Sequence, residues 1–566
     1  MLEEYKSEHG EVMRLIADRG TYFAREDIES FFDKSLPGMD EVMAIIRIAD
    51  LLRAKKYDLI ILDTAPTGHT LVLLSLPEKM EKWVHIMDML MAKHRYIMKT
   101  MVGRYKKDKG DDFIDSQMND IKRVKGLLGN AKSTVFVPVT IPEPMSIYEV
   151  EKAVKTLKKY RIMVNTIIVN RIIQGNSKCP FCSARRQEKE KYMREIEEKF
   201  APYTLVQMPL FPYQIRGMKR LTEYAGILSG EKEYIPPTKS DLLPTVAPLS
   251  KGKLSDIMDK ELKFVIFGGK GGVGKTSIAA ASALYLARHK PDKKMLAFSN
   301  DPAHSLSDSF KQHIGNKITR ISSVDNLYAL EIDGTQMLED FKQVYRDDID
   351  EAFEKFLGGG GVDIKFDREV LGNLLAALPP GLEELMALRK IIELMKDRDY
   401  DLFILDSAAS GHLIRFLELP HLIQEWVTSI LKLLLKYRGT VKLTKAAESL
   451  LDLSRDIKRI LTILADPQQT EFVIITIPEQ MALAEMEDLG KAVSSLKIPC
   501  SHTVVNMIIP ATECDFCAAK RKEQQKYIQE IEAKLSDYTI VPIPMLPHEI
   551  SGLQSLSELG EIMYGG

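Results

Sequence analysis

One unit of sequence occurs twice in this chain, and that repeat constrains the fold more than any other feature. The segment Tyr57–His69 returns as Tyr400–His412, and the chain's two tryptophans, Trp83 and Trp426, hold the same place in each copy. Shorter matches follow in the same order, namely Ile141–Glu143 with Ile477–Glu479, Val169–Asn170 with Val505–Asn506, Cys179–Cys182 with Cys514–Cys517, and Tyr203–Pro209 with Tyr538–Pro544. So many matches in constant order indicate a tandem duplication.

Each copy alternates apolar runs typical of strands with amphipathic stretches typical of helices, for example 134–140 followed by 146–158. This alternation predicts an α/β fold, with a doubly wound parallel sheet in each copy covered by helices on both faces. A proline-rich polar stretch between the copies predicts an extended linker. We therefore expect an N-terminal half at 1–228, a linker at 229–255, and a complete domain at 256–566, with the halves packed as a pseudo-dimer.

A glycine-rich run follows the apolar tetrad 264–267 and opens a helix-like stretch. Strand, loop and helix in that order, with the pattern G-x-x-x-x-G-K-[ST], predict a phosphate cradle lined by backbone N–H groups. Lys275 is expected to reach the terminal phosphates and the Thr276 hydroxyl to bind Mg²⁺. The predicted nucleotide-binding residues of the run are Gly269, Lys270, Gly271, Gly272, Val273, Gly274, Lys275, Thr276 and Ser277. The sequence thus predicts a protein that binds ATP or GTP.

The two copies are unequal in length. The first begins at Met1, which aligns near Met337, so it has no counterpart of the phosphate loop or of the strand before that loop. Loss of a central strand would expose apolar edges on its neighbours, at a cost in stability. Two explanations compete, a degenerate half and a sequence that starts at an internal methionine, and we expect the second.

Composition excludes several classes of function. The 566 residues include 78 basic and 80 acidic side chains, so a net charge of −2 gives no global field that favours nucleic acid. Charges interrupt every apolar run before about 18 residues, the length that a membrane span needs. The start of the chain is polar and acidic, and five cysteines in so long a chain indicate a reducing compartment. We expect a cytoplasmic protein, at most peripheral to membranes.

Several segments in combination resemble one family. They are Lys270–Thr276, Asp301–Asp308, Pro380–Glu384, Asp63–His69 and the two Cys-x-x-Cys pairs. Together these segments resemble the family of arsenical pump ATPases (ArsA) and tail-anchored-protein targeting ATPases, which are P-loop NTPases with a deviant Walker A loop. The chain looks like a tandem form of this family with the first phosphate loop missing.

The resemblance implies roles for individual residues. Lys270 would cross an interface and neutralise phosphate charge on the partner's nucleotide, as an arginine finger does. Asp301 would orient the attacking water, and Asp406 would act on Mg²⁺ through water. Asn506 would contact adenine. The first copy lacks an equivalent of Lys270 in this sequence, so if the protein starts at Met1, we expect efficient ATP hydrolysis to require two chains paired through their second copies.

The cysteine pairs occupy equivalent places in the two copies, and a pseudo-dimer could bring Cys179, Cys182, Cys514 and Cys517 together. Four thiolates would form a structural Zn²⁺ site, or they would hold an iron–sulfur cluster. Two separate thiol pairs are the third alternative. The resemblance favours the zinc clasp of the targeting ATPases. The arsenite-binding relatives place cysteines between the second switch and the Ile-Pro-Glu strand, where neither copy has one.

A Met-rich helical region in each copy is the candidate cargo surface, because such helices adapt to varied apolar partners. The residues are Trp83, Met87, Leu90, Met91, Ile97, Met98 and Met101 in the first copy, and Trp426, Ile430, Leu431, Leu434 and Leu435 in the second. The same pattern also fits core packing. The leading hypothesis is an ATP-driven chaperone for hydrophobic tail segments. The alternatives are the motor of an arsenite pump, which acts on a membrane channel, and an iron–sulfur carrier.

Overall fold

The computed structural model describes a large part of the chain, chiefly residues 51–63, 94–101, 103–174, 178–236, 252–299, 305–332, 399–407, 461–512 and 514–565, with a few isolated helical residues outside these ranges. Statements about structure below concern those residues. Among them, no helix has the length and apolar character needed to span a bilayer.

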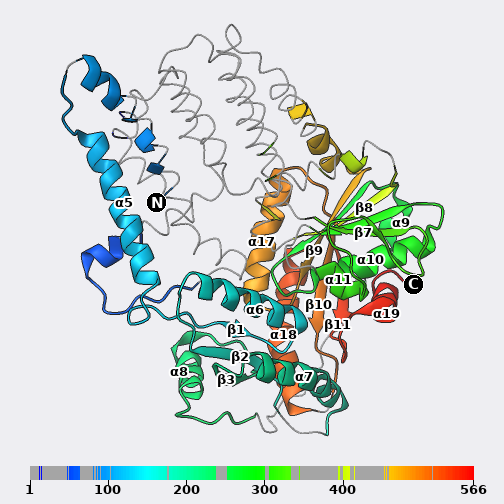
Figure 1. Ribbon diagram of the computed structural model, residues 1–566. Coiled ribbons are helices and arrows are strands. Elements are labelled where there is room, and N and C mark those ends of the chain that lie inside the picture. The colour runs from blue at the N-terminus through cyan, green and yellow to red at the C-terminus, as the bar shows by residue number, and fades with distance from the viewer. Residues whose placement is uncertain are drawn as a thin grey trace.

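The described part of the second half forms an eight-stranded sheet in the order β11-β10-β9-β4-β8-β5-β7-β6 (Figure 1). Neighbouring strands run parallel except β6, which is antiparallel to β7. β4, β5, β8 and β9 are buried along their whole length, which their near-continuous apolar sequences allow. The strands are β4 Phe264–Gly269, β5 Met295–Ser299, β6 Thr319–Arg320, β7 Leu327–Glu331, β8 Leu402–Asp406, β9 Thr470–Thr476, β10 His502–Ile508 and β11 Thr539–Pro544.

Helices cover this sheet on both faces, so it is doubly wound (Figure 1). One core lies under α9 (Ser255–Asp259), α10 (Lys275–His289), α11 (Ser305–Phe310) and α19 (Gly552–Tyr564). The other core lies under α17 (Gln480–Ser495) and α18 (Asp515–Lys534). Five alanines make α10 narrow, so it packs closely against both the sheet and α19.

The described part of the first half forms a three-stranded parallel sheet, β1-β2-β3, with α6 and α7 packed on one face. Its strand register repeats that of β9-β10-β11, including a bulge at Arg171 and Met507, whose φ values are 59° and 56°. The elements are α5 Lys109–Leu128, β1 Val139–Thr140, α6 Pro144–Lys159, β2 Thr166–Ile172, α7 Pro180–Lys199, β3 Thr204–Pro209 and α8 Gly217–Leu228. The expected fold class, two tandem homologous α/β domains, is confirmed.

Apolar side chains of the first half are exposed where their equivalents in the second half are buried. In β1 and the segment before it, the side chains of Val137 and Val139 are 41% and 54% exposed, whereas the equivalent Val473 and Ile475 of β9 are 0% and 1% exposed. Residues 57–63 repeat the sequence of β8, but they form no strand, and Leu59 and Ile61 are exposed. In the second half, β4 pairs with both β8 and β9, and α10 packs over Val473 and Ile475; the described part of the first half has no equivalent of either element.

Candidate nucleotide site and cysteine cluster

The glycine-rich loop lies where the sequence places it, between β4 and α10 at the carboxyl end of the sheet's central strand. A Cβ on Gly269 would lie 2.1 Å from the backbone oxygen of Ile475, so only glycine lets β4 and β9 pair this closely. Gly272 and Gly274 have φ values of 78° and 90°, which turn the loop into the start of α10. The loop therefore presents backbone N–H groups at a helix N-terminus, the geometry that binds phosphate.

The two lysines of the loop make contacts within their own half. The Nζ of Lys275, a side chain that is 8% exposed, donates to the backbone oxygen of Lys270 at 3.0 Å. The Nζ of Lys270 lies 3.5 Å from a carboxylate oxygen of Glu485 on α17. Both ammonium groups thus lie at the loop. The role of Lys270 across an interface stays a prediction, and its contact with Glu485 is one that sequence reasoning missed.

Asp406 ends β8 beside the loop, because β8 pairs directly with β4. The side chain is 1% exposed, and its Oδ2 accepts a hydrogen bond from the Ser299 hydroxyl at 3.1 Å. The next residue, Ser407, donates its hydroxyl to the backbone oxygen of Phe267 at 2.7 Å. A buried carboxylate at this place, with Thr276 in the first turn of α10, is the donor set that would hold Mg²⁺ beside bound phosphates.

Asn506 ties the adjacent strand to the loop. Its Nδ2 donates to the backbone oxygen of Val273 at 2.8 Å, and a Cβ on Gly274 would lie 2.5 Å from that same nitrogen. The amide oxygen accepts from the backbone of Met507, so the side chain is held at both ends. The structure thus brings Asn506 to the nucleotide loop. Contact with adenine stays a prediction.

Asp301 and His304 lie outside the described residues. The helix that follows them, α11, begins at Ser305 and is held by Glu331, whose carboxylate accepts from the backbone and hydroxyl of Ser307 at 2.8 and 2.9 Å. Glu331 is 4% exposed at the carboxyl end of β7. Glu331 thus positions the start of α11, which follows Asp301 in the sequence. The only sign of this role in the sequence was a single acidic residue at the end of an apolar strand.

The four predicted cysteines come together between the halves. Cys179 and Cys514 are the N-cap residues of α7 and α18, and Cys182 and Cys517 lie in the first turn of each helix. All four Sγ atoms lie within 4.8 Å of one another, and the Sγ of Cys182 lies 3.9 Å from that of Cys514. Tetrahedral ligands at a Zn–S bond of about 2.3 Å would stand about 3.8 Å apart, so the cluster has the right size for a metal ion.

The electrostatics of the cluster suit a metal. The hydrogen bond between Cys182 and Cys517, at 3.3 Å, lowers the pKa of Cys517 to about 6 and raises the pKa of Cys182. Arg185 and Lys520 follow at equivalent places, and burial lowers the pKa of each. Two such cations suit a cluster that carries the negative charge of thiolates.

The contact between halves extends beyond the cysteines. The hydroxyl of Tyr192 on α7 donates to Glu549 of the second half at 2.5 Å, and Lys191 lies 3.7 Å from the same carboxylate. The two halves therefore meet at the N-terminal ends of α7 and α18 and between α7 and the segment before α19, as the predicted pseudo-dimer requires (Figure 1).

The candidate cargo surface needs a correction. Met87 and Met91 are 3% and 0% exposed, so they pack inside the protein and line no open surface. Ile97 and Met101 further along are 37% and 83% exposed. Seven of the predicted positions lie outside the described residues. They are Trp83, Leu90, Trp426, Ile430, Leu431, Leu434 and Leu435.

The strand β4, the loop Gly269–Ser277 and the helix α10, set in a parallel doubly wound sheet, define a P-loop nucleoside triphosphatase. A family model described as anion-transporting ATPase, ArsA_ATPase, matches residues 1–230 and 262–565. The chain therefore belongs to the ArsA ATPase family, and it is an ATPase.

Relatives carry both kinds of name found in this family. The chain is 26% identical over 572 residues to ATPase ARSA1 of Chlamydomonas reinhardtii, a match that covers 93% of this chain and 70% of the relative. It is 28% identical over 586 residues to a protein of Halobacterium salinarum that carries the name arsenical pump-driving ATPase, covering 100% and 83%. It is 33% identical over 325 residues to ATPase GET3B of Arabidopsis thaliana, covering 53% and 79%.

Proposed function

We propose that this ATPase is a targeting chaperone, which uses ATP to bind and release hydrophobic membrane-protein segments, including tail anchors, before delivery to a membrane. One observation carries the choice. All five cysteines lie among the described residues, and four of them form the cluster between the halves. The fifth, Cys500, is partly buried against the core under α17 and α18. The thiols therefore join the two halves, and none is left where a metalloid site of the pump type would need it.

The proposed cycle uses the residues of the nucleotide loop and its surroundings, together with Asp301, which lies outside the described residues. ATP and Mg²⁺ would supply the phosphoryl chemistry, and Lys275, Thr276, Asp406 and the loop amides would hold them. Asp301 would orient the attacking water, and Lys270 would complete charge neutralisation. The cysteine cluster would hold Zn²⁺ as a fixed hinge, so that changes at the nucleotide site move the halves relative to each other.

The second candidate, the motor of an arsenite pump, is favoured by the name of the relative from Halobacterium salinarum, which matches the whole chain. This role requires a binding site for arsenite. Arsenite would need soft thiolate ligands, and here these belong to the clasp between the halves. Binding of arsenite would then compete with the metal of the clasp.

The deciding experiment compares the ATPase rate of the full chain with a hydrophobic tail peptide, with a scrambled charged peptide, and with arsenite. We expect stimulation by the tail peptide alone. Stimulation by arsenite alone would establish the pump role and overturn the proposal.

Metal analysis tests the clasp with a matched pair of variants. Wild-type protein is expected to bind one zinc per chain and to lack the visible absorption of iron–sulfur clusters. Cys182→Ser should lose the metal, whereas Cys500→Ser should keep it. Brown protein with stoichiometric iron would instead support the iron–sulfur carrier.

A further inference from the structure

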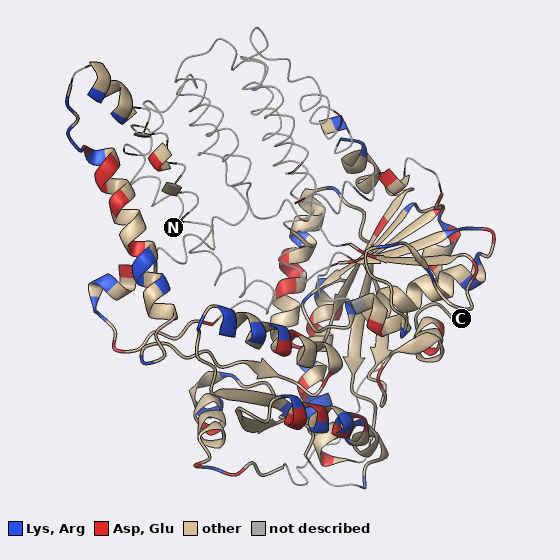
Figure 2. Ribbon diagram, viewed as in Figure 1, with Lys and Arg blue, Asp and Glu red and all other residues tan. Residues whose placement is uncertain are grey.

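A second surface, remote from the nucleotide loop, has chemistry of its own. It consists of the helical residues 94–101, the loop 103–108 and Lys109, the first residue of α5, and is here called the basic arm. Figure 1 shows it at the outer end of α5, and Figure 2 shows Lys and Arg along its loop.

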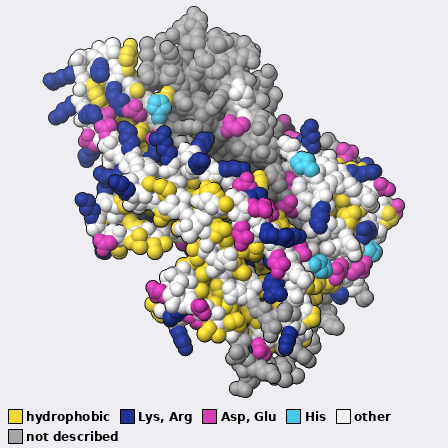
Figure 3. Space-filling view, turned by 60° about the horizontal axis from the view of Figure 1, so that its bottom comes forward, with side chains coloured by type: hydrophobic (Ala, Val, Ile, Leu, Met, Phe, Trp, Pro, Cys, Tyr) yellow, Lys and Arg dark blue, Asp and Glu magenta, His cyan; other side chains and the backbone are white. Residues whose placement is uncertain are grey.

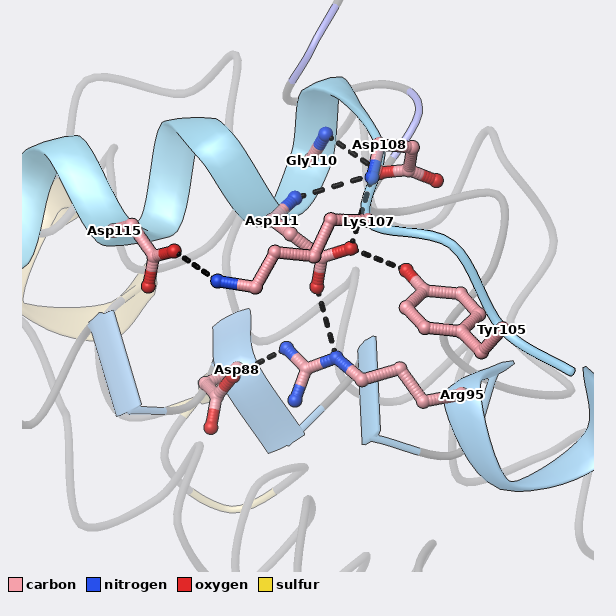
Figure 4. Close-up of polar contacts among 8 residues, drawn as sticks. All are labelled: Asp88, Arg95, Tyr105, Lys107, Asp108, Gly110, Asp111 and Asp115. Atoms are coloured by element: carbon pink, nitrogen blue, oxygen red, sulfur yellow. Dashed lines mark hydrogen bonds and ion pairs between the residues drawn. The ribbon is translucent and has the colours of Figure 1, made fainter. Parts of the chain in front are cut away.

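Two carboxylates next to the basic arm, those of Asp108 and Asp111, are hydrogen-bonded within the structure, whereas those of Asp112 and Asp115 on α5 are exposed. Asp111 on α5 is 5% exposed, and it accepts hydrogen bonds from Arg95, at 2.9 Å, and from the hydroxyl of Tyr105. Asp108 caps α5 by accepting from the backbone of Gly110 at 2.8 Å (Figure 4). These bonds hold the loop against the helix. They also pair the carboxylates of Asp108 and Asp111 with donors inside the protein.

Lys107, in the loop of the basic arm, lies beside a carboxylate of α5. Its Nζ lies 2.6 Å from Asp115 of α5, and both side chains are more than half exposed (Figure 4). Such an exposed pair is weak, so Lys107 stays accessible to another anion.

The outward side of the basic arm carries positive charge and apolar side chains together. Its exposed charged residues, among those described, are all basic: Lys99, Arg104, Lys106, Lys107 and Lys109. The exposed carboxylate of Asp112 follows in α5. Tyr96, Ile97 and Met101 are 47%, 37% and 83% exposed, and the last two share one helical face because they are four residues apart. Figure 3 shows dark blue side chains beside yellow ones, with some magenta ones among them, on the lobe at the upper left of the molecule.

We propose that the basic arm is a docking surface for membranes that contain anionic lipids. Basic side chains are attracted to such a surface, and apolar side chains enter the boundary between headgroups and acyl chains. The combination supplies the two signals that stable peripheral attachment requires. An aromatic side chain such as Tyr96 suits that boundary, because one end of its ring is apolar and the other is polar. The proposal goes beyond the chaperone function and needs neither cargo nor nucleotide.

Sedimentation of the full chain with vesicles tests the proposal, without ATP and without cargo peptide. The vesicles are phosphatidylcholine alone, or phosphatidylcholine mixed with phosphatidylserine. We expect binding to the mixed vesicles, weakened by salt, and little binding to phosphatidylcholine alone.

Two quadruple variants separate local from global charge. The first variant combines Lys99→Gln, Arg104→Gln, Lys106→Gln and Lys109→Gln. It should bind the mixed vesicles about 100-fold or more weakly, because each cation near such a surface raises the affinity by about fivefold. The control removes four exposed lysines of α6 by Lys152→Gln, Lys155→Gln, Lys158→Gln and Lys159→Gln, and it should bind nearly as the wild type does.

A third variant, Tyr96→Ser with Ile97→Ser and Met101→Ser, should lose the part of the binding that survives high salt. Failure of the wild type to bind mixed vesicles would overturn the proposal, and an acidic protein face would then be the better partner for these cations. Equal weakening by both quadruple variants would also overturn it. Neither result bears on cargo-stimulated ATP hydrolysis, so the two proposals fail separately.

Discussion

The sheets of the two halves share sequence and register, but their edges meet different neighbours. In the second half, β9 pairs with β4 on one side and β10 on the other, and α10 covers the face that includes Val473 and Ile475. In the first half, the segment that includes β1 pairs with β2, and its equivalent face is open. The same apolar pattern is core in one half and surface in the other. Burial here is thus a property of the neighbours that a strand acquires.

The helices show the same dependence of burial on neighbouring elements. Leu556 on α19 is 0% exposed because α10 packs against it, whereas the equivalent Leu221 on α8 is 49% exposed. One strand and one helix, β4 and α10, therefore organise both the nucleotide loop and the core of the second half. The described part of the first half has neither.

The largest expected effect tests whether the second half carries all of the ATP site. Lys275→Ala should lower the ATPase rate by about 1,000-fold, because a preorganised charge at the phosphates is lost. Steady-state hydrolysis and titration with a fluorescent ATP analogue measure the rate and the number of sites. We expect one site per chain in the wild type. If the variant keeps the wild-type rate of hydrolysis, another site must hydrolyse ATP, and the contrast between the two halves would be wrong.

A buried acid in the second half predicts a difference in acid stability. Glu471 is 1% exposed where the first half has Val135; burial would raise its pKa, but hydrogen bonds from His502, Lys260 and Ser501 outweigh burial and lower the pKa to about 2. A lowered pKa stabilises the fold above the ordinary value of 4.5, and that contribution is lost as the pH falls toward 2. The loss should be on the order of 3 kcal/mol.

Urea denaturation across that pH window, followed by a probe in the second half, checks the prediction. Glu471→Gln should be less stable than the wild type at neutral pH and should change less with acid. An equal acid dependence in the variant and the wild type would show that Glu471 is not the source.

Two valines at equivalent places give the sharpest comparison of the two sheets. Val473→Ala should cost about 2 kcal/mol of unfolding free energy, because it leaves a cavity under α10. Val137→Ala should change stability by less than about 0.5 kcal/mol, because that side chain is exposed. Denaturation midpoints of both variants measure the contrast. A cost for Val137→Ala as large as that for Val473→Ala would mean that the first sheet is covered in solution.

The sequence predicted local structure well and long-range partners poorly. The run Gly269–Ser277 predicted β4, the loop and α10, because glycine positions and a strand-to-helix transition are local. The repeat predicted the common register and the meeting of the cysteines, because equivalent segments adopt equivalent structures. Residues 57–63 show the limit, since the sequence of β8 does not form a strand without its neighbours. Pairings such as His502 with Glu471 depend on strands brought together only by the fold.

The burial of Met87 and Met91 was also beyond the sequence, because a Met-rich amphipathic pattern fits an open groove and a core equally well. At the site, Glu331 and Glu485 were missed for a related reason. Each reaches its partner from a different element, Glu331 from β7 to α11 and Glu485 from α17 to the loop, and no spacing motif links them.

The smallest expected effect concerns the ion pair between Lys270 and Glu485. Both side chains are partly exposed, at 25% and 39%, so the pair is worth no more than about 1 kcal/mol. If Lys270 must leave Glu485 to neutralise phosphate charge, Glu485→Gln should raise the ATPase rate by up to about fivefold, with nucleotide affinity nearly unchanged. Single-turnover hydrolysis measures the rate, and Glu487→Gln, a charge-matched change on the same helix, is the control. A slower rate in Glu485→Gln would mean that the carboxylate holds Lys270 in its working position, and the loop of the second half would then be complete within its own domain.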